Sequence, residues 1–382
     1  MKHSLVIVQD VPTQFDVPLY NIIAEQQPFS LFVIYTQAPA QDDEIGRKPI
    51  WDHIEKHCYE HLFLCDSKLA SVSDICNEIQ LHHPDHVVIS GYWPKLHRDI
   101  MRCLTQNNVS VGLRSDNTLR HTKLGGLQGK IKRAYLKRLL AKYSVWHPVG
   151  SQAEHYLRSL SGEPRPVSYF PYTADNDWFK EHVLSHRVNR SSYLSQLGFP
   201  EHSQIILGIM KWSEREDPMT LVAAFEAYQS QQPNSRLILV GDGPLRDTVM
   251  AATKPIKNLI YTPGYVSYSQ LPKWYSLADV FVHPAPSEPW GVSVNEALAS
   301  GVPVIASTGV GAAVELIEEG MSGFIFEQRD VQSLVTALKK WAQMKNSRTN
   351  EDIQTQCQLA LAKWNYETVI SAFQNILKNV RR

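Results

Sequence analysis

The chain has 382 residues, of which 43% are hydrophobic and 20% charged, and its 38 Lys and Arg residues balance its 38 Asp and Glu residues, so the formal net charge is zero. This composition excludes disorder, collagen or coiled coil as overall descriptions, and the lack of a basic excess argues against a protein that wraps nucleic acid. At about 150 residues per domain, the length predicts two or three domains.

Cysteine usage and hydropathy point to a reducing compartment. The five Cys residues include no CxxC pair, which is not the pattern of a disulfide framework. No apolar run reaches the ~18 residues of a membrane span. The apolar run near the N-terminus is also shorter than the ~7–15 residues of a signal-peptide core, so we expect a cytoplasmic protein.

Short β-branched apolar runs alternate with longer amphipathic segments, which is the pattern of βαβ units in a parallel sheet covered on both faces. In the first half, strands are predicted at 4–8, 31–35, 61–65, 86–90, 109–113 and 144–149. Helices are predicted around 18–27, 69–82, 95–107, 127–143 and 151–160.

The second half repeats this alternation and ends in one further amphipathic helix. Its strands are predicted at 204–210, 236–243, 258–264, 279–284, 302–307 and 323–327. Its helices are predicted near 219–231, 268–277, 292–300, 330–343 and 352–362, followed by a one-face helix over 366–380.

These elements predict an α/β fold of two doubly wound, Rossmann-like lobes. We expect an N-terminal domain over 1–170 and a C-terminal domain over 171–362, with a hinge at about 171–190. The helical segment 363–382 is expected to pack back on the N-terminal domain. Because ligands of doubly wound sheets bind beyond the carboxyl ends of the strands, two facing lobes imply a cleft between the domains.

The segment HPAPSEPWGVSVNEALASGVPVIASTGVGAAVELI (283–317) carries the strongest chemical signal. A buried strand ends in a Pro-rich loop that holds Glu288, and a helix that begins near Gly291 holds Glu296, with seven residues between the two glutamates. The N–H groups at a helix start favour an anion such as a phosphate. Carboxylates accept hydrogen bonds from sugar or ribose hydroxyls.

This segment resembles the E-x7-E signature of the retaining glycosyltransferases of family 4, which have the GT-B fold. The resemblance extends over the second half through VGDGPLR (240–246) and YTPGYVSYSQLPKWYSLADVFVHP (261–284). The first half is similar more loosely, through LVIVQDVPTQFDVPLY (5–20), GLRSDNT (112–118) and FPYTADNDWF (170–179). The resemblance implies that the donor substrate is a nucleoside-diphosphate sugar.

Carried over residue by residue, the resemblance implies that Glu288 contacts the donor sugar's hydroxyls near the anomeric carbon and that Glu296 holds the ribose hydroxyls. Val266, in the GYV turn, would lie beside the nucleotide base. Backbone contacts with the donor would come from Trp290, Gly291 and Val292, and Gly241 of the VGDGPLR turn completes the donor-binding set.

A diphosphate leaving group needs cations, and the family supplies two basic residues five positions apart after the first strand of the second lobe. Lys211 occupies the first position, but Glu216 stands at the second, where Lys is usual. Because like charges ~4 Å apart repel by ~4 kcal/mol at an effective dielectric of ~20, Glu216 is expected to point away from the diphosphate. We expect Lys211 and Arg215 to neutralise the diphosphate.

No metal or other cofactor is implied. The one D-x-D sequence, Asp175 and Asp177, falls in the predicted hinge and is interpreted as hinge and capping chemistry.

The acceptor side departs from the family pattern. The first turn contains Asp16 but no Gly, so side chains there are expected to shape the acceptor floor. Many relatives place a His-Asp pair after a later strand. Asp116 is the matching acid, whereas Arg114 or Ser115 stands in the place of the His.

Residues 120–142 contain eight basic residues and no acid, with Leu127, Ile131, Tyr135 and Leu139 at four-residue spacing. Such a helix can touch an anionic membrane surface or a lipid-diphosphate acceptor, and a solvated basic face is an equally good interpretation.

The leading hypothesis is a retaining glycosyltransferase that moves a sugar from a nucleoside-diphosphate sugar to a glycan, a lipid-linked or a small-molecule acceptor. Such a protein would act in polysaccharide or glycoconjugate biosynthesis, in the cytoplasm or peripherally on a membrane. The alternative is a non-catalytic, transferase-like subunit that scaffolds an active partner, which the Glu216 substitution motivates. No feature calls for an epimerase or a phosphorylase.

Overall fold

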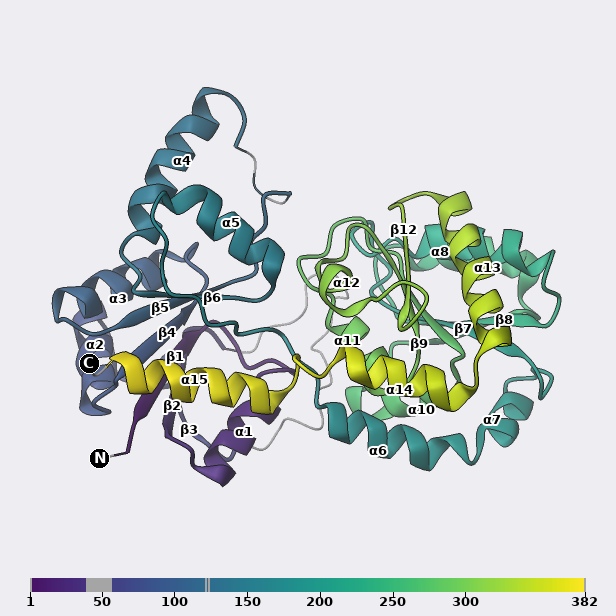
Figure 1. Ribbon diagram of the computed structural model, residues 1–382, viewed down its shortest axis with the longest axis horizontal. Coiled ribbons are helices and arrows are strands. Elements are labelled where there is room, and N and C mark those ends of the chain that lie inside the picture. The colour runs from purple at the N-terminus through teal and green to yellow at the C-terminus, as the bar shows by residue number, and fades with distance from the viewer. Residues whose placement is uncertain (1, 39–56, 121, 123, 381–382) are drawn as a thin grey trace. The chain divides into compact units, whose positions relative to one another are not determined.

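The computed structural model describes residues 2–38, 57–120, 122 and 124–380 (Figure 1). The described residues fall into two compact units. The first comprises the chain as far as Tyr172 together with the segment from Tyr366 onward, and the second comprises residues 173–365.

The first unit is built on one parallel sheet with strand order β3-β2-β1-β4-β5-β6. Its central strand β1 is buried at every position, as expected of a strand covered on both faces. The strands are β1 (Ser4–Gln9), β2 (Ser30–Tyr35), β3 (Glu60–Phe63), β4 (His86–Ser90), β5 (Val111–Ser115) and β6 (Val145–Pro148). The helices are α1 (Val17–Gln26), α2 (Val72–Leu81), α3 (Lys95–Gln106), α4 (Gly126–Leu140), α5 (Ser151–Ser161) and α15 (Tyr366–Val380), with a short 3-10 turn η1 (Leu64–Asp66).

The second unit repeats the design with strand order β12-β11-β10-β7-β8-β9, again all parallel. Its strands are β7 (Gln204–Ile209), β8 (Ser235–Val240), β9 (Ile260–Gly264), β10 (Val280–His283), β11 (Val304–Ser307) and β12 (Gly323–Phe326). Its helices are α6 (Asn176–Arg187), α7 (Arg190–Gln196), α8 (Pro218–Gln229), α9 (Arg246–Thr253), α10 (Leu271–Leu277), α11 (Val292–Ala299), α12 (Gly311–Leu316), α13 (Val331–Ser347) and α14 (Asn350–Ala360), with 3-10 turns η2 (Lys254–Ile256) and η3 (Tyr268–Gln270).

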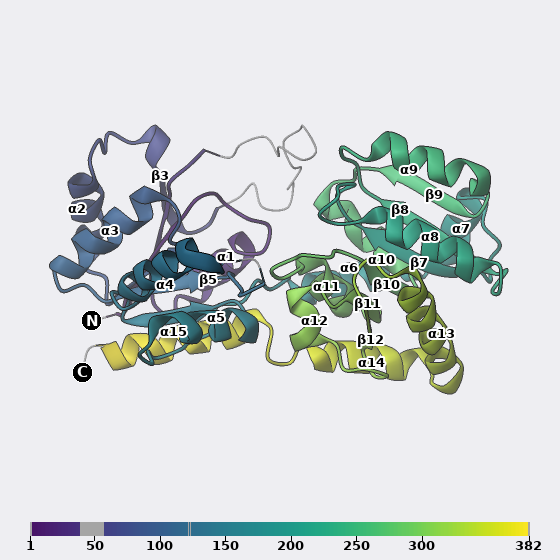
Figure 2. The ribbon, with the colours of Figure 1, turned by 90° about the horizontal axis from the view of Figure 1, so that it is seen from above.

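The C-terminal helix α15 belongs to the first unit although α14, just before it, belongs to the second. Both views show α15 along the first unit, close to its sheet (Figures 1 and 2). Its Phe373 ring packs against Phe29, His147 and Phe170, with centroids 6.3, 5.6 and 4.9 Å apart. Aromatic burial on one helix face therefore joins the end of the chain to its first domain.

The prediction of an α/β fold with two doubly wound sheets is confirmed, and every predicted strand is present. Most of the predicted hinge, 171–190, forms α6, and the boundary between the two compact units falls near its start, between Tyr172 and Thr173. Asp175 caps this helix by accepting a hydrogen bond from the backbone N–H of Trp178 at 3.0 Å, as the capping interpretation of the D-x-D sequence expected. Phe179 and Val183, one turn apart, are its buried residues. Two anchors in twelve residues are too few to reveal the helix by periodicity.

Within the described ranges, no helix combines the length and hydropathy that a membrane crossing requires.

Candidate functional site

The carboxyl edge of the second sheet gathers the residues that the sequence singles out. In the strand order, β10 and β7 are neighbours, and the chain enters the two halves of the sheet from this point. This is the topological switch point, where doubly wound sheets bind ligands. The loop after β7 carries Lys211, Arg215 and Glu216, and the loop after β10 carries Glu288.

The backbone of Glu288 is fixed on both sides. Its N–H donates to the carbonyl of Gly309 at 3.0 Å, and its carbonyl accepts from the N–H of Gly311 at 2.9 Å. These two bonds add a short parallel pairing beyond the end of β11. A side chain on Gly309 or Gly311 would collide with the backbone of the Glu288 loop, at 2.3 and 1.9 Å. The two glycines thus allow the close approach that holds Glu288 in place.

Arg215 joins two carboxylates in the loop after β7. Its guanidinium donates to Glu216 Oε1 at 2.6 Å and also forms an ion pair with Glu288. The other Glu216 oxygen accepts the backbone N–H of Lys211 at 2.8 Å. Glu216 therefore faces the main chain of its own loop, and Arg215 is the cation that lies at Glu288.

Burial raises the pKa of the Glu216 carboxyl to about 7, with a further rise from Glu288, while Arg215 and Lys211 act in the opposite direction. The residue at the position of the family's second Lys is thus a buried carboxylate that holds an Arg in position.

The helix α11 begins at the same place with open backbone donors. Gly291 caps it in a left-handed conformation with φ of 95°. Among the described residues, the N–H groups of Trp290, Gly291 and Val292 donate no hydrogen bond. An added Cβ on Gly291 would lie 2.9 Å from Val310 Cγ1 and 3.2 Å from His283 Nε2, so only glycine fits without displacement. These donors at the positive end of a helix suit an anionic group.

His283, the last residue of β10, is buried beside this helix start. Neither ring nitrogen has a hydrogen-bond partner in the described part of the chain. Burial, with a contribution from Arg215, lowers its pKa to about 4, so the ring is neutral near pH 7 and presents one donor and one acceptor.

Glu296 lies one turn into α11 and is only 3% exposed. The hydroxyl of Tyr275, on α10, donates to Glu296 Oε2 at 3.0 Å. Burial raises the pKa of Glu296 to about 7, against hydrogen bonds from Tyr275 and Tyr268 that lower it. The acid is therefore poised between its two protonation states near neutral pH.

This raised pKa predicts a pH-dependent stability. A carboxyl whose folded pKa exceeds its unfolded value of 4.5 contributes stability that is fully present below pH 4.5 and is lost as the pH rises through about 7. In the parent protein, the free energy of unfolding should fall by on the order of 3 kcal/mol between pH 4.5 and 8 for this reason, at ~1.4 kcal/mol per pKa unit. We expect the Glu296→Gln variant to lack this fall. Urea denaturation of both proteins across this range measures the difference. The exposed Glu226→Gln variant is the control, and parallel curves for Glu296→Gln and the parent would contradict the assignment.

The remaining donor-side residues take different positions. Trp290 is buried, and its Nε1 donates to Asn295 Oδ1 at 3.0 Å, so its side chain braces α11 while its backbone stays open. Gly241 has φ of 146°, and an added Cβ would lie 1.9 Å from the carbonyl oxygen of Met210, so the turn after β8 lies directly against the loop after β7. Val266 is half-buried in the loop after β9.

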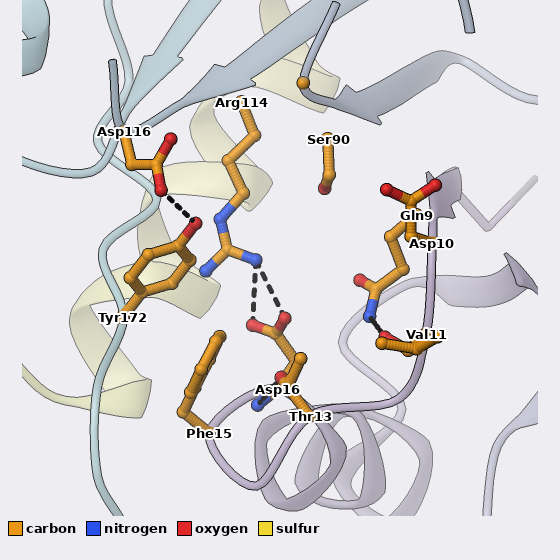
Figure 3. A pocket seen from close by; sticks show the side chains of 11 residues that line it. Gln9, Asp10, Val11, Thr13, Phe15, Asp16, Ser90, Arg114, Asp116 and Tyr172 are labelled. Atoms are coloured by element: carbon orange, nitrogen blue, oxygen red, sulfur yellow. Dashed lines mark hydrogen bonds and ion pairs between the residues drawn. The ribbon is translucent and has the colours of Figure 1, made fainter. Parts of the chain in front are cut away.

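In the first unit, a pocket of about 220 Å³ lies at the switch point between β1 and β4 (Figure 3). Asp16 and Arg114 both line it, and they form a buried ion pair in which Arg114 Nη1 donates to both carboxylate oxygens of Asp16, at 2.8 and 3.0 Å. Arg114 also donates to the carbonyls of Phe170 and Pro171 at 3.1 and 3.0 Å, and its guanidinium lies 3.5 Å from the Phe170 ring centroid. The pair braces the pocket wall, with both residues committed to each other.

Other polar groups of this pocket face its interior. Tyr172 donates its hydroxyl to Asp116 Oδ2 at 3.2 Å. Asp10 Oδ1 lies 3.2 Å from Nε2 of the buried His97, and hydrogen bonding to His97 is the main cause that lowers the pKa of Asp10. The hydroxyl of Ser90 has no hydrogen-bond partner among the described residues. Two carboxylates and an unpartnered hydroxyl in one small pocket suit a ligand that presents hydroxyl groups.

Sequence reasoning did not assign Asp10, His97, Tyr275 or His283. Asp10 directly follows β1 and His283 is the last residue of β10, so their places near the ends of predicted strands were the available signal. His97 and Tyr275 lie on helices, and their local sequence carries no such signal.

The geometry and the comparisons with known proteins agree on the fold. Two units, each built on a doubly wound parallel sheet, have the architecture of the GT-B fold. Residues 189–356 match the family model for glycosyl transferases group 1. The matched segment is 168 of the 382 residues, a little under half of the chain, and this segment is similar to the group 1 glycosyl transferases.

Curated relatives are similar over part of the chain. A GDP-mannose-dependent alpha-(1-6)-phosphatidylinositol monomannoside mannosyltransferase of Mycobacterium tuberculosis is 26% identical over 217 residues, 54% of this chain and 55% of the relative. The alpha-monoglucosyldiacylglycerol synthase of Acholeplasma laidlawii is 27% identical over 151 residues, 37% of this chain and 38% of the relative. The chain thus spans about half the length, or less, of these curated relatives.

Solved structures match the fold over nearly the whole chain. A glycosyltransferase from Rickettsia africae superposes with a TM-score of 0.76 at 14% identity, covering 100% of this chain and 99% of the other. HepE from Anabaena in complex with UDP superposes with a TM-score of 0.73 at 16% identity, covering 99% and 100%. At these identities the likeness establishes the fold.

Proposed function

We propose that this protein is a retaining glycosyltransferase that moves a sugar from a nucleoside-diphosphate sugar to a glycan, a lipid-linked or a small-molecule acceptor in glycoconjugate biosynthesis. One observation carries the proposal. Glu288, Arg215 and the open N–H groups at the start of α11 meet at the switch point of the second sheet, with the buried Glu296 one turn further along. Acids for hydroxyls and donors for phosphates thus occur together.

In the proposed mechanism, Glu296 accepts the ribose hydroxyls and Glu288 accepts hydroxyls of the donor sugar. Arg215 leaves Glu288 and binds the diphosphate. There, Arg215, Lys211 and the N–H groups at the start of α11 stabilise the negative charge that develops on the diphosphate as its bond to the sugar breaks. Such preorganised donors each contribute ~10²–10³ in rate. With these groups available, we propose that no metal ion takes part.

The acceptor is proposed to bind in the pocket of the first unit. Asp10, Asp116 and the hydroxyl of Ser90 present oxygens that match a hydroxyl-bearing acceptor, whereas the Asp16–Arg114 pair keeps the wall rigid. The volume of about 220 Å³ suits one sugar ring or a similar polyol head and not a long chain.

The proposal is tested with a panel of nucleotide sugars that includes GDP-mannose and UDP-glucose. We expect one donor and its free nucleoside diphosphate to raise the thermal unfolding midpoint, because ligands that bind the native state stabilise it. Product from that donor, formed in the presence of EDTA and with the anomeric configuration kept, supports the proposal. Inversion of the anomeric configuration would contradict the retaining mechanism, and loss of activity in EDTA would contradict a reaction without a metal ion. No binding of any nucleotide would favour the scaffolding subunit.

Helix α4 supports a peripheral membrane role. Its Leu127, Ile131 and Tyr135 are 75%, 63% and 44% exposed, and exposed Lys and Arg residues flank them. Leu139, the fourth member of the predicted apolar row, is instead buried in the core of the first unit. The exposed row is one i, i+4, i+8 face with cations on either side, the arrangement of an interfacial helix.

We therefore expect the protein to sediment with vesicles that contain anionic phosphatidylglycerol, and binding to fall at high salt, since each basic residue near the surface contributes ~1 kcal/mol. Ile131→Ser should weaken binding several-fold, and Leu359→Ser, an equally exposed leucine on α14, should not. Equal binding to neutral phosphatidylcholine, or none to anionic vesicles, would reject the role.

A further inference from the structure

A pocket in the second unit lies at the opposite edge of the sheet from Glu288. Its volume is about 280 Å³, and its lining includes Asp279, which directly precedes β10, and Pro303, which directly precedes β11. These positions mark the amino ends of the strands. Gly301, two residues after the end of α11, also lines it, so the eight-residue helix begins at the candidate donor site and ends close to this pocket.

The lining carries a surplus of positive charge. Three cations, Arg187, Arg190 and Lys345, surround a single carboxylate, Asp279, which leaves a net charge of 3 − 1 = +2 on the lining residues. One Asp279 oxygen pairs with Arg190 at 2.9 Å and also accepts the N–H of Ile205 at 2.8 Å. The other oxygen pairs with Lys345. Both carboxylate oxygens of Asp279 are therefore occupied by ion pairs, one with Arg190 and one with Lys345.

Arg187 is the cation of this lining that forms no ion pair among the described residues. Among the described residues its only hydrogen bond is from Nη2 to the carbonyl of Ser300 at 2.8 Å, at the end of α11. Burial is the main cause that lowers its pKa, and the interactions with Cys357 and Asp279 act in the opposite direction, so the cost of holding the guanidinium away from water outweighs them. Four of its N–H donors remain for a ligand.

Amide groups complete the lining. Asn350 and Gln354, on α14, make no side-chain hydrogen bond in the described part of the chain, and both line the pocket. Their N–H₂ groups add donors next to the three cations.

We propose that this pocket binds a phosphate group, carried either by free phosphate or by a small phosphate monoester. The surplus of two positive charges matches the charge of a phosphate dianion. A guanidinium group can also donate two parallel hydrogen bonds to two phosphate oxygens. The pocket is also smaller than those that enclose drug-sized molecules, which favours a small anion. This site goes beyond the proposed transferase reaction and does not depend on it.

The test is isothermal titration calorimetry of the full chain with inorganic phosphate and with glycerol 3-phosphate, at ionic strength held constant with chloride. We expect Arg187→Gln and Lys345→Gln each to weaken binding about tenfold, equivalent to about 1.4 kcal/mol. Lys339→Gln, an exposed lysine on the same helix α13, is the matched control and should bind as the parent does. Lys345→Gln keeps the test valid if Arg187→Gln fails to fold.

Lys211→Gln separates this pocket from the candidate donor site and should also leave binding unchanged. Tighter binding of inorganic phosphate identifies the free ion as the ligand, and tighter binding of glycerol 3-phosphate identifies a monoester. The proposal is overturned if neither probe binds beyond the chloride reference, or if binding is lost in Lys211→Gln and retained in both Arg187→Gln and Lys345→Gln.

Discussion

Replacement of Glu288 by Gln is expected to lower kcat by about 10²–10³ while the protein stays folded. The backbone bonds that fix residue 288, to Gly309 and Gly311, do not involve the side chain and persist in the variant. What is lost is the charge that accepts sugar hydroxyls and pairs with Arg215. Replacement by Ala is expected to abolish transfer.

Steady-state kinetics with saturating donor, together with a urea unfolding curve, check this prediction. Glu318→Gln, an exposed glutamate between α12 and β12, is the matched control and should keep parent activity. Near-parent turnover in Glu288→Gln would remove this residue from the site, and a collapsed unfolding curve would show that its role is structural.

Replacement of Arg215 by Gln is expected to lower kcat/KM by about 10²–10³, because the diphosphate loses a positioned cation. It should also destabilise the fold more at pH 8 than at pH 5. Arg215 lowers the raised pKa of the buried Glu216, so without it this carboxyl binds its proton more tightly and is costlier to ionise.

The double variant Arg215→Gln/Glu216→Gln separates the two effects. Removing the buried carboxyl should restore stability at pH 8 and leave kcat/KM low. Arg158→Gln, which breaks an exposed ion pair with Glu154, is the control and should alter neither quantity by much. Recovery of activity in the double variant would mean that Arg215 serves only to neutralise Glu216.

The Glu216 substitution shows how sequence reasoning and structure complement each other. The sequence identified an acid where the family has a base, and electrostatics required it to face away from a diphosphate. The structure shows a buried Glu216 that accepts the N–H of Lys211 and holds Arg215 beside Glu288. The cation that lies beside Glu288 is therefore Arg215, at the adjacent position. A spacing rule cannot reveal this, since it compares residue types and not side-chain directions.

The acceptor side was less predictable. Asp16 and Arg114 were expected as acceptor contacts, and the structure pairs them with each other across 98 positions of the chain. Asp10 and Ser90, which face the pocket, gave no signal beyond their positions at strand ends. Which polar group faces a pocket depends on rotamers and long-range partners, and neither is encoded in local periodicity.

The sequence by itself determined the two doubly wound sheets, the strands of each, and the loop-to-helix junction that carries Glu288 and Glu296. These follow from hydrophobic periodicity and local turn chemistry, which act over a few residues. Only the tertiary structure decided that α6 forms within the predicted hinge, that His283 and Tyr275 lie at the candidate donor site, and that Arg187, Arg190 and Lys345 line one pocket with Asp279. Those arrangements bring together residues far apart in the chain, so they depend on packing, burial and charge pairing in the folded domain.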